Sequence, residues 1–252
     1  LAKLEANDIV PSVQAHKETL LRRVYFDLIG VPPTPRQIAE FIADNNSNAF
    51  EKIVDRLLAD PGYGERWGRH WLDTARYSDT TGSMNARMGD YRYAYAWSYR
   101  DWVINSINND LPYDQFLKHQ LAADKINNND KLNLAALGFL TVGQRFNNND
   151  DVINDRIDVI GRGMLGLTLA CSRCHDHKFD PVSMQDYYAL KGILLSVTEP
   201  NEGPIIAGDP NSPKYMEFNQ KMRDLENKSF EGFYGLVRDH SNTVSYTHLR
   251  AH

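Results

Sequence analysis

The chain has 252 residues, of which 42% are hydrophobic and 24% are charged, a balance typical of soluble globular proteins with one large core or two smaller cores. Its net charge of -5 disfavours a nucleic-acid partner, because nucleic-acid-binding domains normally present a basic face. No apolar run approaches the roughly 18 residues that a membrane-spanning helix needs, so we expect no membrane span in this chain.

The first recognisable segment, residues 18–30, has the periodicity of an amphipathic helix. Leu21, Val24 and Leu28 recur on one helical face, and Gly30 ends the run. Similar spacing of apolar residues predicts further helices in the same half of the chain. We expect these at residues 34–44, 48–60, 64–79, 91–108 and 113–126.

Capping residues indicate two of the helix starts. Thr34 precedes Pro35 and lies three residues before Gln37, which is the arrangement of a capping box with proline at the first helical position. Ser183 stands in the same relation to Asp186 and is expected to begin another helix.

Two asparagine-rich stretches, residues 126–130 and 146–150, are expected to be solvated loops. Asparagine side chains compete for backbone hydrogen bonds, and the stretches have too few carboxylates for a calcium loop. A helix from Leu132 to Leu140 is expected between them. The sequence contains no alternating strand pattern of useful length, so the expected fold class is mainly α.

Residues 151–175 predict one long helix whose buried face leads into a pair of cysteines. Apolar or sulfur-containing residues recur along this stretch at alternating spacings of four and three residues. They are Ile153, Ile157, Ile160, Met164, Leu167, Cys171 and Cys174. Gly161, Gly163 and Gly166 lie within the stretch and would permit a neighbouring segment to approach closely. We therefore expect a multi-helix orthogonal bundle built around the cysteine motif.

The stretch CSRCHDHKFDP, residues 171–181, contains both cysteines of the chain and two of its eight histidines. Cys171, Cys174 and His175 form the C-x-x-C-H pattern of covalent c-type haem attachment. At this spacing one helical turn directs both thiols toward the vinyl groups of a porphyrin, and the histidine supplies a ring nitrogen to the iron. Haem c is therefore the favoured cofactor.

Two other interpretations of the same stretch stay open, and with them the question of whether the protein is an enzyme. A dense local set of ligands for zinc or iron would indicate a non-haem metal enzyme module. The members of this set are Cys171, Cys174, His175, His177 and Asp180. Alternatively, the two cysteines form a structural disulfide or a redox-active thiol pair.

A haem with two axial ligands also needs a residue on the face opposite the proximal histidine. His70 is the best candidate, because Trp67 and Trp71 flank it and would wall a haem. The alternative role for His70 is that of a histidine that makes hydrogen bonds between packed helices. His177 and Met184 lie too close in sequence to the proximal histidine to reach the opposite face easily.

Three stretches of the chain carry a resemblance to a known family. In order, they are YGERWGRHWLDTARYSDT, YRYAYAWSYRDWVINSINNDLPYDQFLKHQLAAD and MLGLTLACSRCHDHKFDPVSMQDYYALKGIL. They resemble the planctomycete cytochrome domain family catalogued as domain of unknown function 1549, and the resemblance extends over roughly residues 1–197. It implies that Cys171, Cys174 and His175 attach and ligate haem.

The resemblance leaves other motif positions without a role and implies a cellular context. The positions without an assigned role are His70, Asp73, His177 and Asp180. Members of the family resemble large exported proteins with a cytochrome-like domain upstream and a further domain downstream. We therefore expect a periplasmic or otherwise exported protein whose haem exchanges electrons with a redox partner protein or a neighbouring cytochrome domain.

We expect three parts in the chain, namely a helical domain at residues 1–197, a linker with an amphipathic helix at 198–243, and a non-native tail at 244–252. The tail, VSYTHLRAH, resembles a translated sequencing adaptor, so its two histidines are not candidate ligands. Because the first methionine is Met84, we expect a fragment of a longer protein, whose signal peptide lies outside it.

Overall fold

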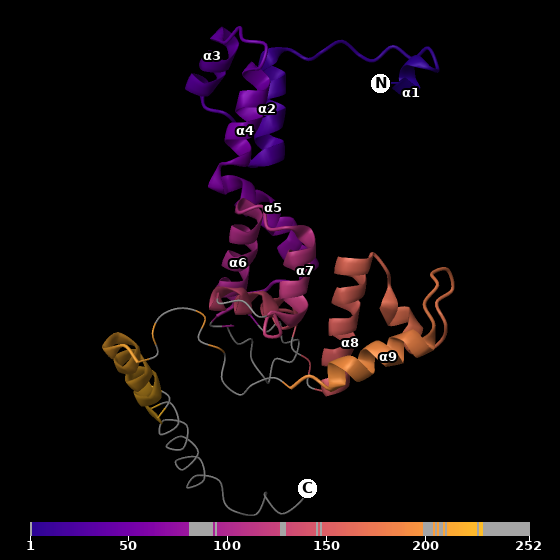
Figure 1. Cartoon of the computed structure of the whole chain (residues 1–252), viewed down its shortest axis with the longest axis vertical. Helices are drawn as coiled ribbons and strands as arrows, with labels where there is room; N and C mark the ends of the chain where they lie inside the picture. Colours follow the sequence, from indigo (N-terminus) through magenta and orange to yellow (C-terminus); the bar gives the residue numbers. More distant parts are fainter. Residues whose placement is uncertain are drawn as a thin grey trace, which may run out of the picture. The chain divides into compact units, whose positions relative to one another are not determined.

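The computed structural model describes residues 2–80, 93, 95–126, 130–144, 146, 148–198, 204, 206, 209, 211–225 and 227–228. These residues form helices and loops without a β-strand (Figure 1). The predicted mainly α class is confirmed, whereas the orthogonal arrangement around the cysteine motif stays a prediction. No helix within these ranges is long and apolar enough to cross a membrane.

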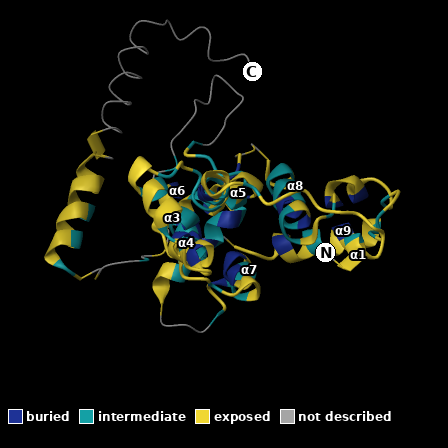
Figure 2. Cartoon of the chain, turned by 90° about the horizontal axis from the view of Figure 1, so that it is seen from above, coloured by how far each residue is buried: buried dark blue, intermediate teal, exposed yellow. Residues whose placement is uncertain are grey.

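The chain divides into two compact units, Leu1–Glu202 and Gly203–His252. The described part of the second unit contains a helix at residues 213–225, at the start of the expected amphipathic helix. None of its described residues is buried, in contrast to the helices of the first unit from residue 17 onward (Figure 2). The expected tail at residues 244–252 lies outside the described residues.

The first unit begins with α1 (Ala2–Glu5) and then three helices that share a small core. These are α2 (Lys17–Leu28), α3 (Pro35–Ala43) and α4 (Ala49–Leu58), as the apolar spacing predicts. Leu21, Tyr25, Phe41 and Leu57 are buried between them. Burial of side chains of this size supplies most of the favourable free energy of such a core, at about 1.5–3 kcal/mol for each fully buried one.

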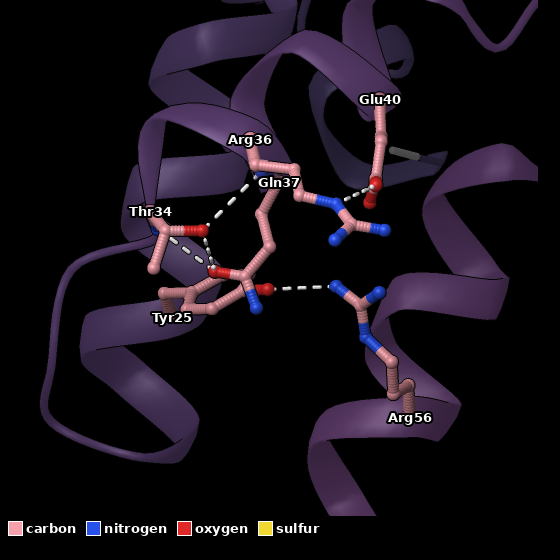
Figure 3. Close-up of polar contacts among 6 residues, drawn as sticks. All are labelled: Tyr25, Thr34, Arg36, Gln37, Glu40 and Arg56. Atoms are coloured by element: carbon pink, nitrogen blue, oxygen red, sulfur yellow. Dashed lines mark hydrogen bonds and ion pairs between the residues drawn. The ribbon is translucent and has the colours of Figure 1, made fainter.

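Polar contacts fix the ends and sides of these helices (Figure 3). The Thr34 Oγ1 accepts a hydrogen bond from the backbone N–H of Gln37, and the Gln37 side chain accepts one from the backbone N–H of Thr34. The predicted capping box is therefore confirmed. Arg56 donates a hydrogen bond of 2.7 Å to the Tyr25 hydroxyl, which joins α4 to α2 (Figure 3).

The largest core lies among α5 (Pro61–Thr74), α6 (Ala96–Asn108), α7 (Tyr113–Ala122) and the 3-10 helix η1 (Lys131–Leu140). The Trp71 indole N–H and the Tyr99 hydroxyl both donate to the Gln120 side-chain oxygen, at 2.6 and 2.7 Å. These hydrogen bonds satisfy the polar atoms of a mainly aromatic core. The helix expected from Leu132 to Leu140 exists, but as a 3-10 helix.

The last helices of the first unit share a third core and contain the cysteine segment. They are α8 (Asn149–Ile160), the π-helical turn η2 (Gly161–Leu165), the 3-10 helix η3 (Leu169–Arg173) and α9 (Met184–Leu195). Ile153, Ile157, Leu169, Tyr187 and Leu194 form the buried part of this core.

The expected continuous helix through residues 151–175 is wrong. The α-helix ends at Ile160, and Gly166 then adopts a left-handed conformation with φ 67°, which turns the chain back on itself. A Cβ atom at Gly161 would lie 2.7 Å from the Leu169 side chain, so the predicted close approach is made by the chain's own next segment. The cysteines therefore leave the buried face and become exposed.

Candidate functional site

The cysteine segment lies on the surface as a short 3-10 helix with an anchored interior. Cys171 and Cys174 are exposed free thiols. Ser172, which lies between them, has 0% exposure and donates a hydrogen bond of 3.3 Å to the carbonyl of Val182. The buried Leu169 holds the start of the same short helix in the core. The segment thus presents both sulfur atoms outward from a fixed backbone.

His175 is exposed and has a defined tautomer. Its Nδ1 lies 2.8 Å from the backbone carbonyl oxygen of Asp176. Because a carbonyl oxygen only accepts hydrogen bonds, Nδ1 must carry the proton and donate it. The lone pair on Nε2 is then available to a metal, which is the usual arrangement of a ligating histidine.

His177 has the opposite tautomer and little exposure, because its side chain is only 9% accessible. Its Nδ1 accepts hydrogen bonds from the backbone N–H groups of Asp180 and Phe179, at 2.8 and 3.3 Å. Its Nε2 must therefore carry the proton, which it donates to the Thr168 Oγ1 at 3.0 Å. Both ring nitrogens of His177 are thus occupied by the chain itself.

The loop from Asp176 to Val182 leads into α9 (Figure 1) and is hydrogen-bonded to the start of that helix. The Asp176 carboxylate accepts a 2.8 Å hydrogen bond from the backbone N–H of Met184. Ser183 and Asp186 form the predicted capping box, which is confirmed, and the hydrogen bonds from Ser183 hold the pKa of the Asp186 carboxyl below its ordinary value. The loop is therefore a braced connection between η3 and α9.

The structure does not assemble the predicted zinc or iron ligands into one site. Among the described residues, no group of three or more histidine, cysteine or acidic side chains is placed to hold a metal ion. His177 and Asp180 approach each other at 3.5 Å, but the Nδ1 atom in this contact carries no proton, so the contact is not an ion pair. These two residues stabilise the loop instead.

His70 does not have the alternative role of a histidine between packed helices, and its role as a haem ligand stays a prediction. It is exposed on α5, with its ring 5.6 Å from that of Trp67, and so it does not lie between packed helices. Trp71 faces the core, where it contacts Phe116 and Phe139, and therefore cannot join Trp67 in walling a haem. In the described part of the chain, no hydrogen bond, ion pair or ring contact joins His70 or Asp73 to the cysteine segment.

A cavity of about 420 Å³ lies beside the third core, at Ile153 and Leu194, and away from the motif side chains. Its lining includes Thr141, Phe146, Val152, Asp155 and Leu194, and it includes neither cysteine nor His175. This cavity is therefore not next to the cysteine motif. The motif lies on an open surface.

The sequence does not predict the ion pair that lies at this cavity. Asp155 lies 2.7 Å from Arg76, and burial raises the pKa of the Asp155 carboxyl although the guanidinium opposes the effect. The pair joins the segment just after α5 to α8. Its two residues are 79 positions apart, so no local sequence pattern predicts it.

A model of the PSCyt2 family, described as a protein of unknown function (DUF1549), matches residues 1–199. The chain belongs to this family. No curated protein and no solved structure matches it. The PSCyt2 match includes both the cysteine segment and the braced loop, which confirms the predicted family number. The cytochrome and planctomycete parts of that prediction stay predictions.

Proposed function

We propose that this PSCyt2 chain is a c-type haem attachment domain that transfers electrons within a larger exported protein. The observation that carries the proposal is the joint presentation of three reactive groups. Cys171 and Cys174 are exposed free thiols, and His175 has Nε2 available because its Nδ1–H is bound to a carbonyl. These are the groups that covalent attachment and proximal ligation need.

Each residue has a distinct part in the proposal. The Cys171 and Cys174 thiols would hold the haem by thioether bonds to its two vinyl groups. His175 offers Nε2 to the iron, and the buried Ser172 keeps the backbone between the thiols in place. When bound, the haem supplies a centre that accepts and releases single electrons.

The open surface around the motif has a consequence for the partner. Haem attached there would have an exposed edge, which suits electron exchange with a redox protein or a neighbouring cytochrome domain. His70 is not part of the proposal, because no described contact joins it to the cysteine segment. A periplasmic or otherwise exported location goes with c-type maturation, in which apoprotein thiols meet haem after export.

The test is expression of the exported chain together with a c-type maturation system. Haem staining of the denatured protein and a reduced-minus-oxidised spectrum are then measured. We expect the unaltered chain to retain haem after denaturation, and Cys174→Ala to lose covalent haem completely. Lys178→Ala, a change at an exposed position in the adjacent loop, is the matched control and should retain it.

A colourless unaltered chain would overturn the proposal. Elemental analysis of the same sample then tests the alternative, because stoichiometric zinc or iron without haem would favour the non-haem metal module. A metal-free, colourless protein with the two thiols oxidised would favour the disulfide.

A further inference from the structure

The peptide unit between Asp176 and His177 connects the two histidines. Its carbonyl oxygen accepts the hydrogen bond from the His175 Nδ1, at 2.8 Å. Its N–H, which belongs to His177, donates to the carbonyl of Val182, also at 2.8 Å. No peptide bond of the described chain is cis, so the carbonyl and the N–H of this unit point in opposite directions. Holding the N–H at Val182 therefore aims the carbonyl at the His175 ring.

The His177 side chain holds the same peptide unit from a second direction. Its ring bridges the Thr168 hydroxyl, before the cysteine segment, and the Asp180 backbone N–H, after it. These two contacts fix the position of the His177 Cα atom, which is one end of the axis about which the Asp176–His177 peptide plane turns. With the backbone bond to Val182, the ring leaves the peptide plane little freedom.

The Val182 carbonyl links this arrangement to the thiols. It accepts the backbone hydrogen bond of His177 and also the hydroxyl hydrogen bond of Ser172, the buried residue between the cysteines. One carbonyl oxygen thus fixes the peptide that orients His175 and the backbone that presents Cys171 and Cys174. The positions of the sulfur atoms and of the ligating nitrogen are set by a shared frame.

We infer that His177 is a positioning residue for His175, which it holds in the Nδ1–H tautomer with Nε2 presented to the haem iron, and this inference rests on the proposed haem function. His177 does not itself ligate the iron, because both of its nitrogens are used within the loop. It acts through the Asp176 carbonyl. A hydrogen bond to the far nitrogen of a ligating histidine raises the basicity of the near nitrogen.

The tautomer of His175 distinguishes a positioning role of His177 from a merely structural one. If His177 only stabilised the loop, its loss would lower the unfolding temperature but leave the His175 tautomer unchanged in the folded protein. If His177 positions His175, its loss frees the Asp176 carbonyl and His175 becomes a mixture of tautomers. The tautomer is visible in long-range proton–nitrogen correlation spectra of the imidazole rings.

The experiment uses the haem-free chain at about pH 8, where imidazole is ordinarily neutral. We expect the unaltered protein to show His175 protonated at Nδ1 and His177 protonated at Nε2. His177→Ala should shift His175 to the mixture found in a peptide of residues 171–180. His177→Gln should restore the Nδ1–H form, because the amide offers an acceptor to Asp180 and a donor to Thr168. A folded His177→Ala protein that keeps His175 wholly in the Nδ1–H form would overturn the inference.

A second variant serves if His177→Ala does not fold. Thr168→Val removes only the partner of the His177 Nε2 and leaves a side chain of similar size at an exposed position. We expect it to produce a smaller share of the second His175 tautomer, and an unchanged His175 spectrum would count against the inference. Circular dichroism verifies that each variant keeps its helices.

Haem-loaded protein distinguishes failure of the inference from failure of the proposed function. Loss of the hydrogen bond to Nδ1 makes Nε2 a weaker donor to ferric iron, so His177→Ala should have a higher reduction potential than the unaltered protein, and His177→Gln should return toward it. If the unaltered chain takes up no haem, the proposed function fails while the tautomer spectra still decide the role of His177. If haem is attached and neither tautomer nor potential changes, only the inference fails.

Discussion

The cysteine segment, residues 171–175, and the loop that follows it, residues 176–182, are adjacent in sequence and opposite in character. The reactive atoms of the first are exposed, and the two thiols are free. In the second, the side chains of Asp176 and His177 are engaged with backbone and hydroxyl groups of the chain. The difference shows that neighbouring polar residues can have separate functions. Those of the first segment present reactive groups to solvent, and those of the second hold the backbone in place.

The two histidines make this contrast sharpest. His175 donates from Nδ1 and leaves Nε2 open, whereas His177 accepts at Nδ1 and donates from Nε2. A pattern of residue types does not distinguish them, because the tautomer depends on which neighbour is a donor and which is an acceptor. The residue types alone predict that both histidines are metal ligands, but the described residues do not form such a site.

The largest expected effect on stability is at Leu169, the buried residue at the start of the short helix that carries the exposed thiols. Leu169 is 6% exposed and packs against Gly161, so Leu169→Ala should lower the unfolding free energy by about 2–5 kcal/mol. Cys171→Ala, two residues along at an exposed position, should change it by less than about 0.5 kcal/mol. Equilibrium urea unfolding of the haem-free chain measures both, and similar losses would contradict the contrast.

A moderate effect is expected where the loop meets α9. Ser183→Ala removes the helix cap and should cost about 1 kcal/mol at neutral pH, with Gln185→Ala, at an exposed position in the same helix, as the control. The pKa of Asp186 is lowered by its hydrogen bonds with Ser183 and so the folded state favours the carboxylate. This stabilisation is present above the ordinary carboxyl pKa and is lost as the pH falls through the lower folded value.

The pH dependence provides the check on that interpretation. The stability difference between the unaltered chain and Ser183→Ala should be largest near neutrality and should narrow below about pH 4. Urea unfolding at a series of pH values measures it. A difference that stayed constant down to the lowest accessible pH would exclude Asp186 as its source.

The smallest effect is expected at Phe179, within the braced loop. Phe179 is 83% exposed; its backbone N–H donates to His177, and its ring has only a surface contact with the Lys178 ammonium at 5.2 Å. Phe179→Ser keeps that N–H and should leave the unfolding free energy within about 0.5 kcal/mol of the original. Thermal unfolding followed by circular dichroism measures this, and a loss above about 1 kcal/mol would show that the Phe179 side chain packs in solution.

Local patterns predicted those parts of the fold that local chemistry determines. Thr34 with Gln37, and Ser183 with Asp186, form the expected capping boxes, because the partners of a helix start lie within one turn. The apolar spacing likewise placed α2 and α4. α5 ends sooner than expected, at Thr74. Two residues later Arg76 adopts a positive φ, which the apolar spacing does not predict.

The prediction was wrong where the apolar spacing of a helix continues but the helix itself ends. Residues beyond Ile160 keep the spacing of a helix, yet Gly166 turns the chain and brings Leu169 onto Gly161. The apolar spacing is present, but glycine lacks the backbone preference that would continue the helix. The role of His177 was equally hidden, because its partner Thr168 lies nine residues away, on the other side of the cysteine segment.

Ser172 gives the C-x-x-C-H pattern an unequal pair of variable positions. Ser172 is completely buried, whereas Arg173 is exposed. A larger side chain at position 172 would overfill the space under the thiols, while the exposed position 173 has room for side chains of other sizes. For anyone redesigning or searching for this motif, only one of its two unspecified letters is free to vary.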